Sequence, residues 1–436
     1  MATEWLRGIV PDNFLRELSI QSKYPGRATQ QNLCIICRGS RMLCGRWRCP
    51  VLIRAQSLAK VKPLITSAYI FGSSPPAVFV GRIGYPRVSV GPMVPPFRGD
   101  TEILDTPEAW GDKTVQEIVD FRYSLIRGKV TADVYEAVNG GKNIEALQEL
   151  AMGKHPVDAE VVLEKIPLPR LIFSDDVQPF GPSAPLKSFS ATNIKADPRI
   201  ERAFYDKDLK AADAVLELYN SGTMVSKIQK AFSLGMFGDG SRRRLVPTRW
   251  SITAVDSIIS QRLIDEIKQF PSINEFRVYT FQRMNNLFVA ILMPENWRFE
   301  WIEAWFPNTT WNQRSATSPA VMGDWEPYQG RTTYPEIGGC YYACRLAVAE
   351  KLREEKRQAG ALVIREIHPG FILPLGVWFT RESVRAMLRP PPSTFPTFRE
   401  ALNYAVQKLT LPLERWVSAS RLIREEIAQK KILEFM

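Results

Sequence analysis

The chain has 436 residues, 45% of them hydrophobic, with 11 tryptophans and 22 phenylalanines. This composition allows a core in roughly two to three domains and excludes an intrinsically disordered chain. The net charge of +11 favours a polyanionic partner such as DNA, although many basic proteins bind none. No apolar stretch is long enough for a signal-peptide core or a bilayer span, so we expect a cytoplasmic protein without a membrane partner.

Near the start of the chain, residues 11–24 have the apolar spacing of a short helix, and a cysteine cluster follows. Its four members are Cys34, Cys37, Cys44 and Cys49. In a reducing cytosol, thiols spaced this closely indicate a metal site rather than disulfides. Zn²⁺ prefers four such ligands in a tetrahedron, which leaves no open position for catalysis. We therefore expect a structural zinc knuckle, with an iron–sulfur cluster as the alternative.

The same knuckle carries four arginines and no acid. They are Arg38, Arg41, Arg46 and Arg48. One interpretation is that they compensate the formal charge of −2 that four thiolates leave on Zn²⁺. The other is that the excess positive charge contacts DNA phosphates, and we favour it because four cations exceed the charge to be neutralised.

Residues 66–97 are rich in Gly, Pro and Ser and predict short strands joined by tight turns. Within them, Gly81 and Gly84 are more consistent with turn glycines than with a phosphate-binding loop, because no clear helix follows. Helices are then expected in segments that carry capping signals or apolar periodicity. These segments are residues 115–127, 143–153, 208–220, 224–234 and 254–270. The first begins after a capping box of Thr114 and Glu117 and is expected to stop at Gly128.

Between these helices lies the densest basic segment in the interior of the chain, residues 238–250. Its candidate nucleic-acid contacts are Arg242, Arg243, Arg244, Arg249 and Trp250. A solvated loop would have the same composition. Alternatively, the arginines contact a nucleic-acid backbone while Trp250 stacks on a base.

The second half of the chain mixes strands and helices without regular βαβ alternation. Strands are expected at 276–283, 287–293, 299–306 and 362–367, and helices at 340–357, 380–388, 398–409 and 413–429. The first two strands are expected to form a hairpin around Asn285-Asn286. This order predicts an α+β fold of mixed helices and antiparallel strands, with an N-terminal zinc knuckle and C-terminal helices leading to a flexible tail. The expected regions are 1–60, the main domain 61–290, a second α+β region 291–410, and the helix and tail 411–436.

The sequence selects no catalytic residue. His155 and His368 are the only histidines, and no nucleotide-loop or HExxH motif occurs. Five acids with no selective spacing could bind Mg²⁺ for phosphodiester chemistry. They are Asp256, Glu303, Asp324, Glu326 and Glu336. Glu303 lies between Trp301 and Trp305 on an apolar strand, so it is either buried with a raised pKa or directed outward.

The last eight residues end in large apolar side chains. The spacing of Gln429, Ile432, Phe435 and Met436 resembles the motif by which replication and repair proteins bind the sliding clamp (PCNA). In one turn of 3₁₀ helix, Ile432 and Phe435 would share a face that can enter a hydrophobic pocket. The alternative is a terminal helix that folds back on the core of the protein.

Taken in order, several motifs resemble those of the archaeal Nre family of DNA repair proteins, and the resemblance covers nearly the whole chain. The motifs are the cysteine knuckle, Ser74–Pro86, Pro247–Thr253, Ile337–Ala343, Leu375–Trp378 and the terminal segment. The resemblance implies zinc ligation by the four knuckle cysteines and clamp binding by the four tail residues. It implies no catalytic residues.

We therefore expect a DNA repair factor that the clamp recruits to DNA and that contacts DNA through basic surfaces. Clamp-bound, it would be associated with the nucleoid. The alternative is a DNA-processing or nucleotide-using enzyme with a site near Gly72–Tyr85, Arg242–Arg249 and Glu336. That alternative requires these three stretches to meet in one pocket.

Overall fold

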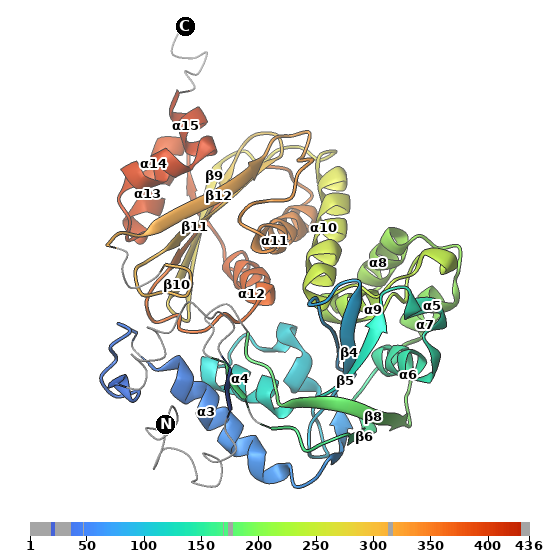
Figure 1. Ribbon diagram of the computed structural model, residues 1–436. Helices are drawn as coiled ribbons and strands as arrows, with labels where there is room; N and C mark the ends of the chain where they lie inside the picture. Colours follow the sequence, from blue (N-terminus) through green and yellow to red (C-terminus); the bar gives the residue numbers. More distant parts are fainter. Residues whose placement is uncertain are drawn as a thin grey trace, which may run out of the picture. The chain divides into compact units, whose positions relative to one another are not determined.

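The computed structural model describes residues 19–21, 36–46, 48–168, 170–172, 178–312 and 317–428 (Figure 1). The chain divides into two compact units. One comprises Met1–Leu43 and Arg48–Ile258, and the other comprises Cys44–Trp47 and Ile259–Met436. Within the described ranges, no helix is both long and apolar enough to cross a bilayer.

The first unit contains a six-stranded sheet with the strand order β2-β6-β8-β5-β4-β3. Its strands are β2 (Tyr69–Ser74), β3 (Val78–Val80), β4 (Arg87–Val94), β5 (Ile126–Asp133), β6 (Val157–Leu163) and β8 (Ser183–Thr192). Strands β5 and β8 pair in parallel and the other neighbours are antiparallel. The short strands expected in residues 66–97 are confirmed.

The predicted helices of the first unit are present, with shifted ends. The helices are α3 (Pro50–Val61), α4 (Val115–Ser124), α5 (Glu136–Asn139), α6 (Gly141–Met152), α7 (Pro198–Tyr205), α8 (Ala211–Asn220), α9 (Val225–Ser233) and α10 (Thr248–Ile267), the last continuing into the second unit. Thr114 and Glu117 form the predicted capping box at the start of α4. Helix α10 begins six residues earlier than expected, so the segment around Trp250 is helical rather than a loop.

Gly128 does not end helix α4, as the sequence had suggested, but lies inside strand β5. A side chain at Gly91, on the neighbouring strand β4, would place its Cβ 1.8 Å from the Gly128 carbonyl oxygen. The two strands can approach only because Gly91 has no side chain. This glycine pair therefore serves sheet packing rather than helix termination.

A short strand replaces part of the helix predicted for residues 11–24. Residues Ser19–Gln21 form β1, which pairs in parallel with β7 (Arg170–Ile172). The other residues of the predicted helix lie outside the described ranges.

The second unit contains another six-stranded sheet, with the order β12-β11-β13-β10-β9-β14. Its strands are β9 (Phe276–Arg283), β10 (Asn286–Met293), β11 (Arg298–Trp305), β12 (Ala320–Glu326), β13 (Gly360–Ile367) and β14 (Ser393–Phe395). Strands β11 and β13 are parallel, whereas the other neighbours are antiparallel. Both sheets are therefore mixed, which confirms the α+β class but not a purely antiparallel arrangement.

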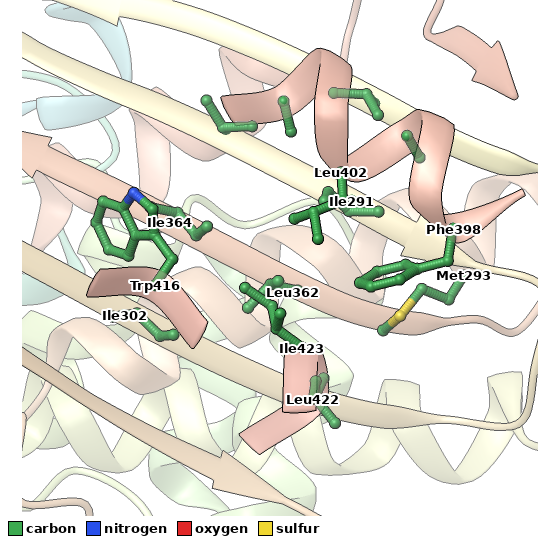
Figure 2. Packing of buried hydrophobic residues seen from close by; sticks show 14 of the residues in the cluster. Ile291, Met293, Ile302, Leu362, Ile364, Phe398, Leu402, Trp416, Leu422 and Ile423 are labelled. Atoms are coloured by element: carbon green, nitrogen blue, oxygen red, sulfur yellow. The ribbon is translucent and has the colours of Figure 1, made fainter. Parts of the chain in front are cut away.

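Helices cover both faces of this sheet (Figure 1). They are α11 (Cys340–Glu355) and α12 (Val377–Met387) on one face, and α13 (Phe398–Lys408), α14 (Leu413–Ala419) and α15 (Arg421–Ala428) on the other. Figure 2 shows the apolar layer beneath α13–α15, where Ile291, Ile364 and Trp416 are fully buried. The opposite face buries aromatic side chains together with charged pairs, including Arg365 with Glu303 and Arg345 with Glu326.

The single helix predicted for residues 413–429 is broken at Ser420. Glu300, buried on strand β11, accepts hydrogen bonds from the Ser420 hydroxyl and from the backbone N–H groups of Arg421 and Leu422. The Ser420 oxygen in turn accepts the Ile423 N–H at 3.0 Å. Ser420 is thus the N-cap of a new helix, α15, whose first turn is fixed to the sheet.

Candidate nucleic-acid surface

The turn between strands β3 and β4 presents apolar side chains to solvent. Gly84, at φ +87°, has the left-handed conformation that glycine accommodates without strain, and its carbonyl accepts the Arg87 N–H at 2.9 Å. Ile83 is 74% exposed and Tyr85 is 51% exposed. Two large apolar side chains displayed on one tight turn suggest a contact surface.

The start of helix α10 lies beside this turn. The Thr248 hydroxyl accepts the Val80 N–H at 2.9 Å, which ties the helix to the end of strand β3. Two residues later, Trp250 is 45% exposed, and its ring centre lies 5.1 Å from that of Tyr85. The β3–β4 turn and the basic segment, more than 150 residues apart in sequence, therefore form one surface.

A third segment joins them through backbone hydrogen bonds. The Val134 N–H donates to the Pro86 carbonyl at 3.0 Å, and the Leu245 N–H donates to the Val134 carbonyl at 2.7 Å. The next residue, Tyr135, is exposed, and the Arg244 guanidinium lies 4.3 Å from its ring centre. Sequence analysis did not find Tyr135, because no local pattern marks it and only the tertiary hydrogen bonds place it here.

We call this the aromatic surface, defined by Tyr85, Tyr135 and Trp250 and by the exposed arginines that flank them. The arginines are Arg82, Arg87, Arg244 and Arg249. Among the described residues, none of the four forms an ion pair. Exposed rings can stack on bases and unpaired guanidinium groups can contact phosphates, so the surface has both elements of a single-strand binding site.

Two carboxylates near this surface accept hydrogen bonds from backbone N–H groups. Asp133 accepts the Tyr135 N–H at 3.1 Å, and Glu136 accepts the Asp133 N–H at 2.8 Å. With two carboxylates against four guanidinium groups, the surface keeps a net positive charge that suits an anionic ligand.

The arginines of the basic segment differ in their exposure to solvent. Arg243 is buried and donates three hydrogen bonds, to the carbonyl oxygens of Gly238, Phe204 and Asp206. It therefore holds the loop together instead of facing a ligand. Arg242 is exposed and lies 3.6 Å from the Asp239 carboxylate.

The arginines of the knuckle are also divided. Arg38, Arg41 and Arg48 are exposed, whereas Arg46 is buried. The exposed three could contact phosphates, as the sequence predicted, whereas the burial of Arg46 suits a packing role.

The knuckle is partly described. The Cys37 carbonyl accepts the N–H groups of Ser40 and Arg41, and its sulfur accepts the Leu43 N–H at 3.4 Å. Backbone N–H donors of this kind stabilise a metal-bound thiolate. Cys49 is buried, Cys44 is partly buried, and no described cysteine forms a disulfide. Cys34 lies outside the described ranges, and the residues within them contain no group of three metal-binding side chains.

The predicted clamp-binding residues Gln429, Ile432, Phe435 and Met436 lie outside the described residues. Helix α15, which immediately precedes them, is fixed to strand β11 on two sides. Besides the Glu300 contacts, Arg298 pairs with Glu425 at 2.9 Å and with Glu426. The attachment point of the terminal segment is therefore firmly held.

Four of the five acids proposed as catalytic candidates have structural partners, whereas Glu336 is exposed. Glu303 is buried and pairs with Arg365 at 2.9 Å, and burial raises its pKa, as one of the two sequence interpretations held. Glu326 pairs with Arg345 at 2.8 Å. Asp256 accepts a hydrogen bond from Gln229, and Asp324 accepts one from Arg331.

The two histidines lie in different settings. His155 is exposed on the surface. The His368 ring stacks on Phe306 at 4.3 Å, and its Nε2 atom lies 3.3 Å from the Glu366 carboxylate. That carboxylate already accepts the backbone N–H groups of Thr410 and Leu411.

Two of the three stretches required by the enzyme alternative meet. Gly72–Tyr85 and Arg242–Arg249 come together in the first unit, whereas Glu336 belongs to the second. No single unit therefore contains the complete constellation.

Comparison with known proteins gives a consistent result along the chain. Residues 43–312 match a family model described as archaeal Nre, N-terminal, and residues 326–435 match one described as archaeal Nre, C-terminal. The chain is 46% identical to DNA repair protein NreB of Archaeoglobus fulgidus, over 92% of this chain and 100% of that protein. No solved structure matches the chain.

Two further relatives are named DNA repair protein NreA. The one from Archaeoglobus fulgidus is 37% identical over 86% of this chain and 93% of its own length. The one from Haloferax volcanii is 35% identical over 79% of this chain and 84% of its own length.

Proposed function

Because the chain belongs to the archaeal Nre family, whose relatives reported above are named DNA repair proteins, we propose that it acts in DNA repair and contacts DNA through the aromatic surface. The observation that carries the DNA contact is the convergence of Tyr85, Tyr135 and Trp250 beside four arginines without ion pairs in the described chain. Exposed rings favour unstacked bases, so the preferred ligand is DNA with single-stranded character.

Fluorescence anisotropy with a labelled single-stranded oligonucleotide tests this contact. Each of Tyr85→Ala and Trp250→Ala removes a stacking platform worth about 1–3 kcal/mol, so binding should weaken roughly 5- to 150-fold. Tyr205→Ala is the matched control, because Tyr205 is also an exposed tyrosine beside another aromatic ring, Phe204. Equal affinities of all three variants and the wild type would refute the contact.

The proposal includes recruitment by the sliding clamp through Gln429, Ile432, Phe435 and Met436. Support comes from the spacing of these residues and from the firmly held helix α15 that precedes them. Phe435→Ala removes about 1.5–3 kcal/mol of apolar burial and should weaken clamp binding roughly 10- to 150-fold in calorimetry.

Lys430→Ala is the control for the clamp experiment, because it changes a spacer residue of the motif. Deletion of residues 429–436 should abolish clamp binding and leave the thermal unfolding temperature unchanged. Undiminished binding by the deletion variant would rule out this tether.

Structural zinc at Cys34, Cys37, Cys44 and Cys49 is the third element of the proposal. Four soft thiol donors suit tetrahedral Zn²⁺, and the N–H donor to the Cys37 sulfur suits a bound thiolate. Elemental analysis should find one zinc per chain, lost in Cys44→Ser and kept in Cys340→Ser. Iron together with visible absorbance would instead establish the iron–sulfur alternative.

A further inference from the structure

Among the residues that the structure describes, one arginine in the middle of the first unit has no partner for its charge. Arg127, on strand β5, has its Cζ atom 4.8 Å from the Phe79 ring centre and 4.6 Å from the Phe180 ring centre. The side chain is half-buried, and its Nε atom has lost contact with solvent. Within the described residues, no hydrogen-bond acceptor or carboxylate reaches the guanidinium group.

The surrounding charges leave this cation uncompensated. Burial lowers the pKa of Arg127 to about 10, and the neighbouring positive charge of Arg122 adds to the effect. Asp105 is the carboxylate that attracts it, but the Asp105 side chain already pairs with the Lys230 ammonium group at 2.9 Å. The described carboxylate that attracts Arg127 is thus already paired with a lysine.

Such an arrangement is costly in a folded chain. A charge removed from water without a hydrogen-bonding partner destabilises the native state, and buried polar groups that lack a partner are rare. The two phenylalanine rings interact favourably with a cation, but they offer no acceptor to its N–H groups. The missing partner is therefore an anion with oxygen acceptors.

We propose that Arg127 anchors a binding site for a phosphate group. A guanidinium fork between aromatic rings keeps its N–H edge available, and that edge matches two phosphate oxygens. Phosphate also carries more negative charge than a carboxylate, which suits a guanidinium that has the positive charge of Arg122 near it. The site is separate from the aromatic surface, and the inference does not depend on the DNA repair proposal.

The test uses the full-length protein and inorganic phosphate at constant ionic strength. Phosphate should raise the thermal unfolding temperature of the wild type, and calorimetry should give a saturable isotherm. In Arg127→Met, phosphate binding should weaken roughly 10- to 100-fold, because the charged hydrogen bonds are lost. Without phosphate, this variant should unfold at or above the wild-type temperature, because an unpaired buried charge has been removed.

Arg98→Met is the matched control. Arg98 also lies over a phenylalanine ring, with its Cζ atom 5.1 Å from the centre of Phe71, but it pairs with Asp158 at 2.9 Å. Its variant should keep the full phosphate response. Arg127→Lys, which keeps the charge but loses the fork, should show an intermediate response.

Comparison of 5′-phosphorylated and 5′-hydroxyl oligonucleotides, and of mononucleotides, identifies the source of the phosphate. A preference for one of these over inorganic phosphate would extend the proposal to that ligand. The proposal would be overturned if phosphate changed neither the unfolding temperature nor the calorimetric signal of the wild type. It would also be overturned if Arg127→Met bound phosphate as tightly as the wild type. Destabilisation of Arg127→Met with an unchanged phosphate isotherm would assign Arg127 a packing role instead.

Discussion

The two six-stranded sheets differ in how the arginine side chains that they carry or cover are paired. In the second unit, Arg345 and Arg365 each meet a carboxylate at 2.8 Å and 2.9 Å, respectively. In the first unit, the described residues offer Arg127 no such partner, and the nearby aromatic surface carries four arginines without ion pairs. A sheet whose buried charges are matched internally is complete by itself, whereas unmatched charges indicate where a ligand belongs. The proposed DNA and phosphate contacts both lie in the first unit, whereas the two buried pairs of the second unit serve its own packing.

Substitution of Arg365 should have the largest effect on stability, and it tests whether the buried ion pairs hold the second unit together. Arg365→Met leaves the Glu303 carboxylate buried and also frees Asn286, which accepts two hydrogen bonds from the guanidinium. We expect a loss of about 3–5 kcal/mol in the free energy of unfolding, measured by chemical denaturation. Hydrogen exchange should rise in β10, β11 and β13.

The double variant Arg365→Met/Glu303→Leu is the control for that experiment. Replacing both charges by apolar side chains should recover much of the lost stability. A single variant that loses less than about 1 kcal/mol would show that the pair is not essential to the scaffold.

Asp197→Asn tests whether the first unit also contains matched charges away from its binding surfaces. Asp197 is buried, caps helix α7, and pairs with Arg199 and Lys227. The Arg199 hydrogen bonds hold the pKa of Asp197 at about 2, below its ordinary value of 3.8. A lowered pKa contributes stability above pH 3.8 that is lost as the pH falls to about 2.

The variant should therefore lose about 2 kcal/mol at pH 7 and approach the wild type near pH 2, as measured by denaturation at each pH. Asp112→Asn, at an exposed surface pair, should change little. A pH-independent difference would show that Asp197 acts through packing rather than through its charge.

Thr114→Ala should have a smaller effect, confined to helix α4. The Thr114 hydroxyl accepts the Glu117 N–H, and the Glu117 carboxylate accepts the Thr114 N–H at 2.8 Å. Loss of this cap should cost about 1 kcal/mol and increase hydrogen exchange at the start of α4. Thr114→Ser keeps the oxygen and should behave like the wild type. Increased exchange throughout the sheet would contradict a local role.

Arg249→Gln should have the smallest effect on stability, within about 0.5 kcal/mol. Its effect should appear in DNA binding, where the logarithmic salt dependence falls by about 1 if Arg249 contacts one phosphate. Arg262→Gln is the control, because Arg262 lies on the same helix but pairs with Glu266. An unchanged salt dependence in Arg249→Gln would place the DNA contact elsewhere.

Local signals in the sequence predicted much of the fold. The hairpin between β9 and β10 turns at Met284 and Asn285, both with positive φ, as the Asn285-Asn286 pair had indicated. The capping box indicated the start of α4, and an apolar run with Trp301 and Trp305 indicated β11. These features depend on residues that are close together in the sequence, so local sequence patterns can predict them.

Features that depend on distant residues were missed. Ser420 ends one helix and begins another because Glu300, 120 residues away, accepts its hydrogen bond. Gly128 was interpreted as a helix stop, but it lies in a strand because Gly91 allows a close approach. For the binding surface, composition indicated Arg249 and Trp250, whereas Tyr135 joins them only through the backbone bonds of Val134.

Helix α15 has a mechanical consequence for the proposed clamp contact. Three residues separate Ala428, at the end of α15, from Ile432. Even a fully extended chain would span at most about 14 Å between these Cα atoms. A clamp bound to Ile432 and Phe435 would therefore be joined to the second unit by a short linker, which would keep this unit close to the clamp. The length of this linker therefore limits how far the second unit can move relative to the bound clamp. A Gly-Ser insertion after Ala428 would lengthen the linker without altering helix α15 or the clamp-binding residues.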